Sequence, residues 1–218
     1  MNYASLIPLF PLIGFLTVGL FGRRMKSEKL VGTIASSAIL LSFVTAVATF
    51  MGLLGMPAEQ RSFTSTLYSW MAAGSFNVNI AYQFDQLSIL FTLIITGIGF
   101  LIHVYSIGYM HGDKSFPRFF AYLNLFVFMM LNLVLADNFL LTFLGWEGVG
   151  LASYLLIGFW YDRKFDGSYI TWTGDAAKKA FIVNRIGDFG VLAAMFMLFN
   201  QFGTLEYNAI NTMAPTVW

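Results

Sequence analysis

The sequence predicts an all-α membrane protein, a polytopic bundle of about six transmembrane helices. Of its 218 residues, 58% are hydrophobic and only 11% are charged, and the mean hydropathy is +0.72. Because a soluble domain of this length carries about 25% charged residues, most of this surface cannot face water. Long apolar runs recur along the chain, and basic residues cluster in every second connection between them.

A helix needs about 20 apolar residues to cross the hydrocarbon core of a bilayer. Six segments reach this length, with ends defined to within a few residues. They are 3–21, 30–54, 84–109, 119–135, 139–161 and 177–200. Residues 1–54 thus hold two spans, and residues 84–200 hold the other four. The first run lacks both a basic start and a small-residue cleavage site, so we interpret it as a membrane helix and not as a signal peptide.

The basic residues predict which side of the membrane each connection faces, because Lys and Arg concentrate in cytoplasmic loops. Ten of the twelve lie in or beside the first, third and fifth connections. Arg61 lies on the other side, and Arg185 lies inside the sixth helix. The ten are Arg23, Arg24, Lys26, Lys29, Lys114, Arg118, Arg163, Lys164, Lys178 and Lys179. This distribution places both ends of the chain outside, which is the periplasm in a bacterium.

Three stretches lie outside the spans. The outer connection 55–83 contains two partly alternating segments, 62–70 and 76–82, on either side of Ala-Ala-Gly-Ser. This pattern is compatible with a short outer β-hairpin and equally with an irregular loop. The inner connection 162–175 is polar and aromatic and is expected to pack on a neighbouring chain or at the membrane interface. Residues 201–218 are predicted to form an outer tail.

The composition excludes several classes of function. Twelve basic and eleven acidic residues leave no basic excess for binding nucleic acid. The chain has no cysteine, which excludes disulfides, thiolate zinc sites and Cys-ligated iron–sulfur clusters. Only two histidines are present, so ligands for a haem or a metal ion are scarce. We therefore expect no cofactor and no metal in this chain.

Three ionisable residues fall well inside the predicted spans, where a charged side chain costs about 2.5–3.5 kcal/mol on insertion scales. Arg185 and Asp188 lie three residues apart in the sixth helix, so they share a face and can form an ion pair. Glu147 lies about nine residues into the fifth helix, and its partner must come from another helix. Intramembrane charges of this kind point to a transport function.

Glu147 is the main candidate for that function. A carboxyl group shielded from water can exchange its proton near neutral pH, and an approaching cation drives the proton off again. Glu147 and a cation would then load and unload protons. The alternative is that Glu147 is a fixed hydrogen-bond anchor and that Arg185 and Asp188 form a purely structural pair. Gly148 and Ala152 form a small-xxx-small step that lets another helix approach Glu147.

Other polar residues carry weaker signals. His103 lies toward the inner end of the third helix and is a candidate for proton entry, although hydrogen-bonded packing is the simpler interpretation. Asp85 and Asp137 lie at outer helix ends, where helix capping is expected.

The run Leu-Gly-Trp-Glu-Gly-Val-Gly-Leu at 144–151 resembles the fifth-helix signature of one family, subunit L (chain 5) of respiratory complex I, the NADH:quinone oxidoreductase. The segment 99–105 with His103 resembles its third helix, and 118–122 with 135–138 resembles its fourth helix and exit. Lys179-Ala-Phe and 184–188 resemble its sixth helix. The matches cover about residues 80–205.

The resemblance implies an antiporter-like fold and a membrane-arm subunit that translocates protons while quinone is reduced elsewhere. NADH, flavin, iron–sulfur clusters and quinone would belong to partner subunits. The expected partners are other membrane-arm subunits, especially another antiporter-like subunit, and lipid. The expected location is the cell inner membrane, or the mitochondrial or plastid inner membrane system.

The same resemblance assigns roles to individual residues. In the family the glutamate of the fifth helix works against a lysine of a seventh helix, and the match carries the glutamate's role to Glu147. Arg185, Asp188 and Lys179 correspond to further residues of the family's sixth helix, and with Glu147 they are the residues that we predict to carry proton translocation.

The chain also departs from the family. Family members are far longer, and this sequence stops before a seventh membrane helix, so we expect a fragment that does not pump alone. The inner connection is also slightly long. Two other functions stay open from the sequence. One is the large subunit of a multisubunit sodium/proton antiporter, and the other is an assembly scaffold that transports nothing.

Overall fold

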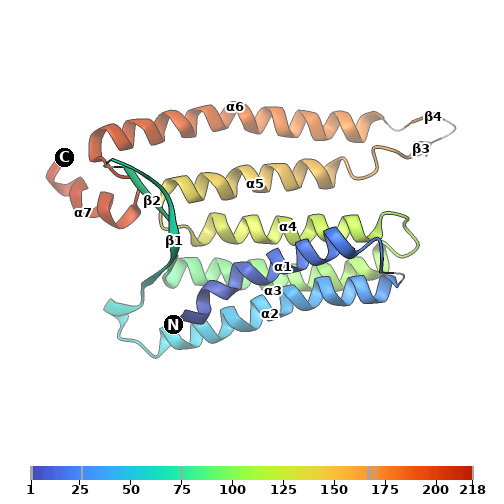
Figure 1. Ribbon diagram of the computed structural model, residues 1–218, viewed down its shortest axis with the longest axis horizontal. Helices are drawn as coiled ribbons and strands as arrows, with labels where there is room; N and C mark the ends of the chain where they lie inside the picture. Colours follow the sequence, from blue (N-terminus) through green and yellow to red (C-terminus); the bar gives the residue numbers. More distant parts are fainter. Residues whose placement is uncertain (1, 26, 75, 166–167, 170, 218) are drawn as a thin grey trace.

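The computed structural model describes residues 2–25, 27–74, 76–165, 168–169 and 171–217. Within them, six helices are long and apolar enough to cross a membrane. They lie side by side with roughly parallel axes, which confirms the predicted helix bundle (Figure 1). These helices are α1 Leu6–Phe21, α2 Glu28–Leu54, α3 Gln86–Tyr109, α4 Phe116–Leu135, α5 Phe139–Ile157 and α6 Thr171–Phe202.

The largest difference from the predicted boundaries is at α6, which begins at Thr171 and not near 177. Its first turns are polar, so hydropathy detected only the later, apolar part of the helix. Lys178 Nζ lies 3.8 Å from Asp175 Oδ1, a pairing that supports the exposed first turns. The inner connection is therefore shorter than predicted. It contains the strands β3 (Lys164–Phe165) and β4 (Ser168–Tyr169), which pair antiparallel.

Helices α1 to α4 form a compact bundle, α5 packs on α4, and α6 packs on α5. Two clusters of buried apolar side chains lie in this bundle, and helices in lipid associate mainly through such packing. The cluster nearer the hairpin includes Ile7, Ile39, Phe84, Leu131, Leu135 and Leu141. The cluster at the opposite end includes Val18, Val31, Met110, Phe116, Phe120 and Phe159.

Two glycines allow α5 to lie close against α4. A Cβ on Gly145 would overlap the backbone nitrogen of Leu133, and a Cβ on Gly148 would overlap the side chain of Met129. Ala152 is fully buried on the same helix. The predicted small-residue step therefore packs against α4, whereas the charged partner of Glu147 comes from a different helix.

The outer connection forms a β-hairpin, which resolves the alternative that the sequence left open. Strand β1 (Phe63–Ala73) pairs antiparallel with β2 (Phe76–Phe84), and its register is irregular at two places. Gly74 adopts a positive φ of 61° in the turn, a conformation that suits glycine. Tyr82 of β2 donates a hydrogen bond of 2.9 Å from its hydroxyl to Asn132 Oδ1 of α4. The hairpin is thus attached to the end of the bundle (Figure 1).

The predicted outer tail contains a short helix, α7 (Tyr207–Val217). Its first backbone N–H, from Tyr207, donates to Asp137 O at 3.1 Å. Asn138 caps α5 by accepting from the backbone N–H of Leu141, so Asn138 and not Asp137 is the cap. Asp85 caps α3 as expected. Burial, together with the nearby Glu206 charge, raises the pKa of Asp137 above its ordinary value.

The connections that carry the predicted inner basic residues lie at the end of the bundle opposite the hairpin. The short 3-10 helix η1 (Asn2–Ser5) and α7 lie at the hairpin end, as an even number of spans requires (Figure 1). Lys26, one of the ten basic residues, falls outside the described part of the chain. We call the hairpin end outer and the opposite end inner, following the predicted sidedness.

Candidate functional site

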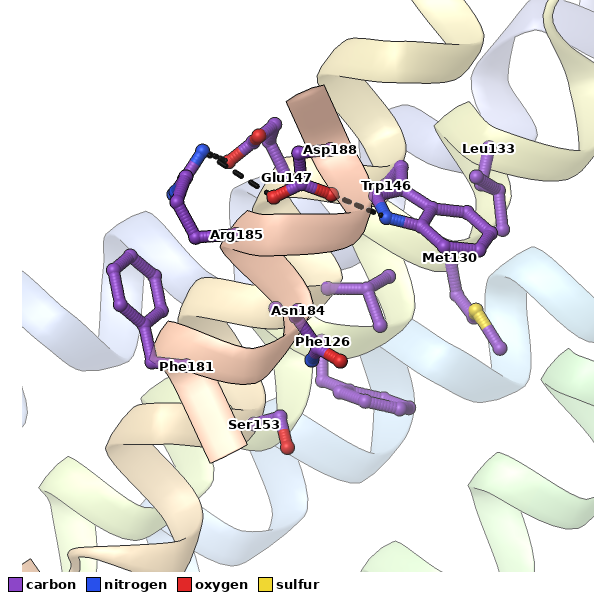
Figure 2. A pocket seen from close by; sticks show the side chains of 12 residues that line it. Phe126, Met130, Leu133, Trp146, Glu147, Ser153, Phe181, Asn184, Arg185 and Asp188 are labelled. Carbon is purple, nitrogen blue, oxygen red and sulfur yellow. Dashed lines mark hydrogen bonds and ion pairs between the residues drawn. The ribbon is translucent and has the colours of Figure 1, made fainter. Parts of the chain in front are cut away.

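The structure brings the three intramembrane charges together. Arg185 Nη1 forms an ion pair with Glu147 Oε2 across the interface of α5 and α6. The same nitrogen lies 3.5 Å from Asp188 Oδ2, which confirms the predicted pairing within α6. Arg185 is thus also the partner that Glu147 requires from another helix. Figure 2 shows the two carboxylates on the same side of the guanidinium, both facing one of its nitrogens.

Trp146 completes this cluster and was not singled out from the sequence. Its indole N–H donates to Asp188 Oδ1 at 2.9 Å, so both oxygens of Asp188 have a partner (Figure 2). An indole N–H within an apolar helix needs a hydrogen-bond acceptor, and this requirement could have identified Trp146 from the sequence. The contact crosses from α5 to α6 and holds Asp188 in place.

The charges of the cluster do not balance. When both acids are ionised, two carboxylates face one guanidinium and the net charge is −1. Glu147 Oε1 is buried and has no hydrogen-bond partner among the described residues. A buried acceptor without a partner is costly, and an unbalanced buried charge costs more. A proton on Glu147 would remove both costs at once.

A cavity of about 290 Å³ adjoins the cluster, between α4, α5 and α6. The guanidinium carbon of Arg185 lies 4.8 Å from the centre of the Phe181 ring, a cation–π contact that orients the arginine. Ser153 and Asn184 provide polar groups on the inner side of the charges. The lining residues are Phe126, Met130, Leu133, Trp146, Glu147, Val149, Gly150, Ser153, Phe181, Asn184, Arg185 and Asp188 (Figure 2).

Two residues considered from the sequence lie apart from this cavity. Lys179 is exposed on α6 and does not line the cavity, so the structure does not bring it to the charges. His103 is buried in α3, with Nδ1 2.7 Å from Gly99 O and Nε2 3.2 Å from Asn124 Nδ2. Both ring nitrogens of His103 have partners, which agrees with the packing interpretation. Among the described residues, no group of three His, Cys, Asp or Glu side chains could hold a metal ion.

Sequence profiles of known families match two parts of the chain. Residues 70–120 match the family described as "NADH-Ubiquinone oxidoreductase (complex I), chain 5 N-terminus". Residues 136–218 match the family described as "NADH:quinone oxidoreductase/Mrp antiporter, TM". The second range includes all three charges and Trp146.

Similar proteins extend these matches over nearly the whole chain. NADH-quinone oxidoreductase subunit L of Pseudomonas aeruginosa is 43% identical over 99% of this chain and 34% of its own length. Subunit L of Escherichia coli is 42% identical over 99% of this chain and 33% of its own length. The chain therefore spans about a third of these curated relatives.

A solved structure supports the fold. A chain in the structure of the membrane-bound sulfane sulfur reductase, an archaeal respiratory membrane complex, matches with a TM-score of 0.80. The match has 17% sequence identity and covers 100% of this chain and 41% of the other. At this identity the match shows a common fold and nothing more.

Proposed function

Because this chain belongs to the subunit L (chain 5) family of NADH-quinone oxidoreductases, we propose that it is the Glu147-bearing part of a proton-translocating membrane-arm subunit. It is a multi-pass protein of the inner membrane. The whole protein couples quinone reduction to proton transport. This chain itself holds no redox centre. NADH, flavin, iron–sulfur clusters and quinone belong to partner subunits. The alternative of a large sodium/proton antiporter subunit is not favoured, because the profile at 70–120 is that of complex I chain 5.

One observation carries this proposal: two acids share one guanidinium inside the membrane, and Glu147 Oε1 is buried without a partner among the described residues. Proton uptake at Oε1 neutralises the cluster. Approach of a further cation would favour loss of that proton, because an ionised Glu147 would then lie beside two positive charges. The cluster can therefore alternate between a state in which Glu147 carries a proton and a state in which it does not.

The exposed face of α6 supports the approach of such a cation. The Arg185 side chain is 48% exposed at the level of the bilayer, and Ile186 and Phe189 are exposed beside it. Lipid is a costly environment for an arginine, so we infer that another element of the assembled protein covers this face. The lysine that the family places on a seventh span would approach Glu147 from there.

The cavity provides polar groups for a proton path on the inner side of the carboxylates. Ser153 and Asn184 line it between the inner end of the bundle and the carboxylates, and hydroxyl and amide groups can hold a chain of water molecules. Trp146 and Asp188 act as positioning residues, because they hold Arg185 within reach of Glu147 without moving a proton themselves.

Replacing Glu147 by Gln tests the proposal. Glutamine keeps the size and the hydrogen-bonding capacity of the side chain but cannot ionise. In the full-length protein within its complex, E147Q should reduce proton translocation per quinone reduced while the complex still assembles. The measurements are dye-reported proton uptake into reconstituted vesicles and native gel electrophoresis of the complex.

Glu59→Gln is the matched control, because Glu59 is an exposed glutamate in the outer connection. It should leave both readouts unchanged. Loss of assembly without a specific loss of translocation in E147Q would identify a scaffold. An assembled E147Q complex that pumps normally would refute the role of Glu147.

A further inference from the structure

Helices α1 and α4 leave a groove between their inner halves that the proton site does not use. It has a volume of about 370 Å³ and runs along the last two turns of α1 and the first two turns of α4. Gly19 keeps the groove open, because a Cβ there would meet only Ala121 Cβ at 3.8 Å and Phe15 at 4.0 Å. The walls are otherwise formed by Leu16, Val18, Leu20, Pro117 and Tyr122, with Arg23 and Arg118.

The groove continues into a wider, polar hollow of about 610 Å³ at the inner end of the bundle. The two spaces share Arg23, Pro117 and Arg118, so both arginines lie at the junction. The polar hollow is formed by the connections between α1 and α2 and between α3 and α4. Together the two spaces have a polar part at the membrane surface and an apolar part that extends along the helices.

The acidic residues of the hollow already have partners. Glu28 accepts from His111 Nδ1 at 2.8 Å and from the backbone N–H of Gly112. Asp113 forms an ion pair with Arg163 and accepts from the Trp160 indole N–H at 3.2 Å. These carboxylates are therefore not available to neutralise further arginines.

Arg23 and Arg118 have no ion pair with a carboxylate of the described residues. Arg118 donates from Nη2 to Phe159 O at 3.1 Å, and its guanidinium carbon lies 4.8 Å from the Phe159 ring centre. Its Nε is buried and has no acceptor among the described residues. Arg118 is thus held in position by neutral groups, and no carboxylate of the described residues forms an ion pair with it.

We propose that this groove binds one anionic glycerophospholipid, with the phosphate between Arg23 and Arg118 and an acyl chain between α1 and α4. A guanidinium matches a phosphate in charge and in hydrogen-bonding geometry. Basic pockets between helices on the cytoplasmic side are suited to anionic lipid headgroups. The apolar part lies along spanning helices, where acyl chains are the surrounding solvent. The inference does not depend on proton transport by Glu147.

Native mass spectrometry of the full-length protein, purified with its complex, tests this site. The protein is exchanged into detergent containing equal amounts of phosphatidylglycerol and phosphatidylcholine, and retained lipid is counted. Wild-type protein should retain phosphatidylglycerol preferentially. Each of R23Q and R118Q should weaken that retention about fivefold, the effect expected of one basic residue near an anionic lipid.

Two further variants separate charge from shape. Arg24→Gln removes a neighbouring exposed arginine that lines neither space, and it should retain phosphatidylglycerol like the wild type. Gly19→Leu keeps both arginines but fills the apolar part, and it should lose the bound lipid. Since Gly19 is exposed, this variant should fold and assemble normally.

Three outcomes would overturn the proposal. The first is equal retention of phosphatidylcholine, and the second is unchanged retention in the R23Q/R118Q double variant. The third is displacement of the bound lipid by millimolar inorganic phosphate, which would indicate a site for free anions. Proton translocation, measured after the same preparations are reconstituted into vesicles, keeps this test separate from that of Glu147, because E147Q should retain the lipid.

Discussion

In the proposed mechanism, two acids lie near one arginine and differ in how their oxygens are partnered. Asp188 has a partner for each oxygen, Trp146 on one and Arg185 on the other. Its side chain is only 6% exposed, whereas that of Glu147 is 20% exposed. Glu147 has one paired oxygen and one buried oxygen without a partner among the described residues. Glu147, the acid with an oxygen that lacks a partner, is therefore the one on which we expect the proton to move on and off.

Exchanging Arg185 and Asp188 tests whether their order matters. In R185D/D188R the ion pair within α6 can still form, but the Trp146 N–H would face a guanidinium, which has no acceptor atom. We expect proton translocation to fall by at least about tenfold, since more than one hydrogen bond of about 1 kcal/mol is lost near Glu147. Vesicle acidification assays on the assembled complex provide the measurement. Full activity of the exchanged protein would show that the pair is only structural.

At the scale of elements, the contact between α4 and α5 sets the position of Glu147. Gly145 and Gly148 flank Glu147 on the same helix and lie against α4 at Leu133 and Met129. Because α5 lies so close to α4 at these two glycines, a rotation of α5 about its axis would bring larger side chains into overlap with α4. The rotation of α5 in turn decides that Glu147 points toward α6 and not toward lipid.

Replacing Gly145 by Ala tests this close approach. The added Cβ would overlap the backbone of Leu133, which cannot move as easily as a side chain. Overpacking of this kind costs about 1–3 kcal/mol, so the melting temperature of the purified protein in detergent should fall.

Gly150→Ala is the matched control on the same helix, because a Cβ there meets no atom within 4 Å. Alanine is the better helix former by about 1 kcal/mol, so this control should be neutral or slightly stabilising. Equal melting temperatures for the two variants would mean that α4 and α5 are not tightly packed at Gly145.

At the scale of the whole molecule, the two ends of the bundle differ in how many basic residues they carry. The β1–β2 hairpin, η1 and α7 cover the outer end and carry few basic residues (Figure 1). The inner end carries the basic connections, including the Asp113–Arg163 pair. Burial alone would raise the pKa of Asp113, but the Ser115 N–H, the Trp160 indole and Arg163 together lower it below its ordinary value.

The unequal distribution of basic residues between the two ends predicts the orientation of the protein in the membrane. The chain has no cysteine, so single cysteines can be introduced as reporters. In sealed right-side-out vesicles, E59C should react with a membrane-impermeant maleimide, because Glu59 lies in the outer connection. D162C, in the inner connection, should react only after the vesicles are permeabilised. The unmodified full-length protein provides the background, and the reverse labelling pattern would refute the assigned orientation.

The sequence by itself determined the number of spans, because length and hydropathy are local properties of a segment. It also indicated the pairing of Arg185 with Asp188, which follows from their spacing along one helix. The motif around Glu147 was sufficient to indicate the family. The early start of α6 was missed, because its polar first turns lie beyond the apolar run that hydropathy detects.

Only the tertiary structure decided which side chains meet across helices. Three arrangements depend on the rotation and depth of separate helices: Arg185 pairs with Glu147, Trp146 reaches Asp188, and Arg23 and Arg118 line one groove. Those quantities are set by close contacts such as that of Gly145 with Leu133. A periodic pattern shows which residues share a face of one helix, but it does not show which face of another helix lies opposite.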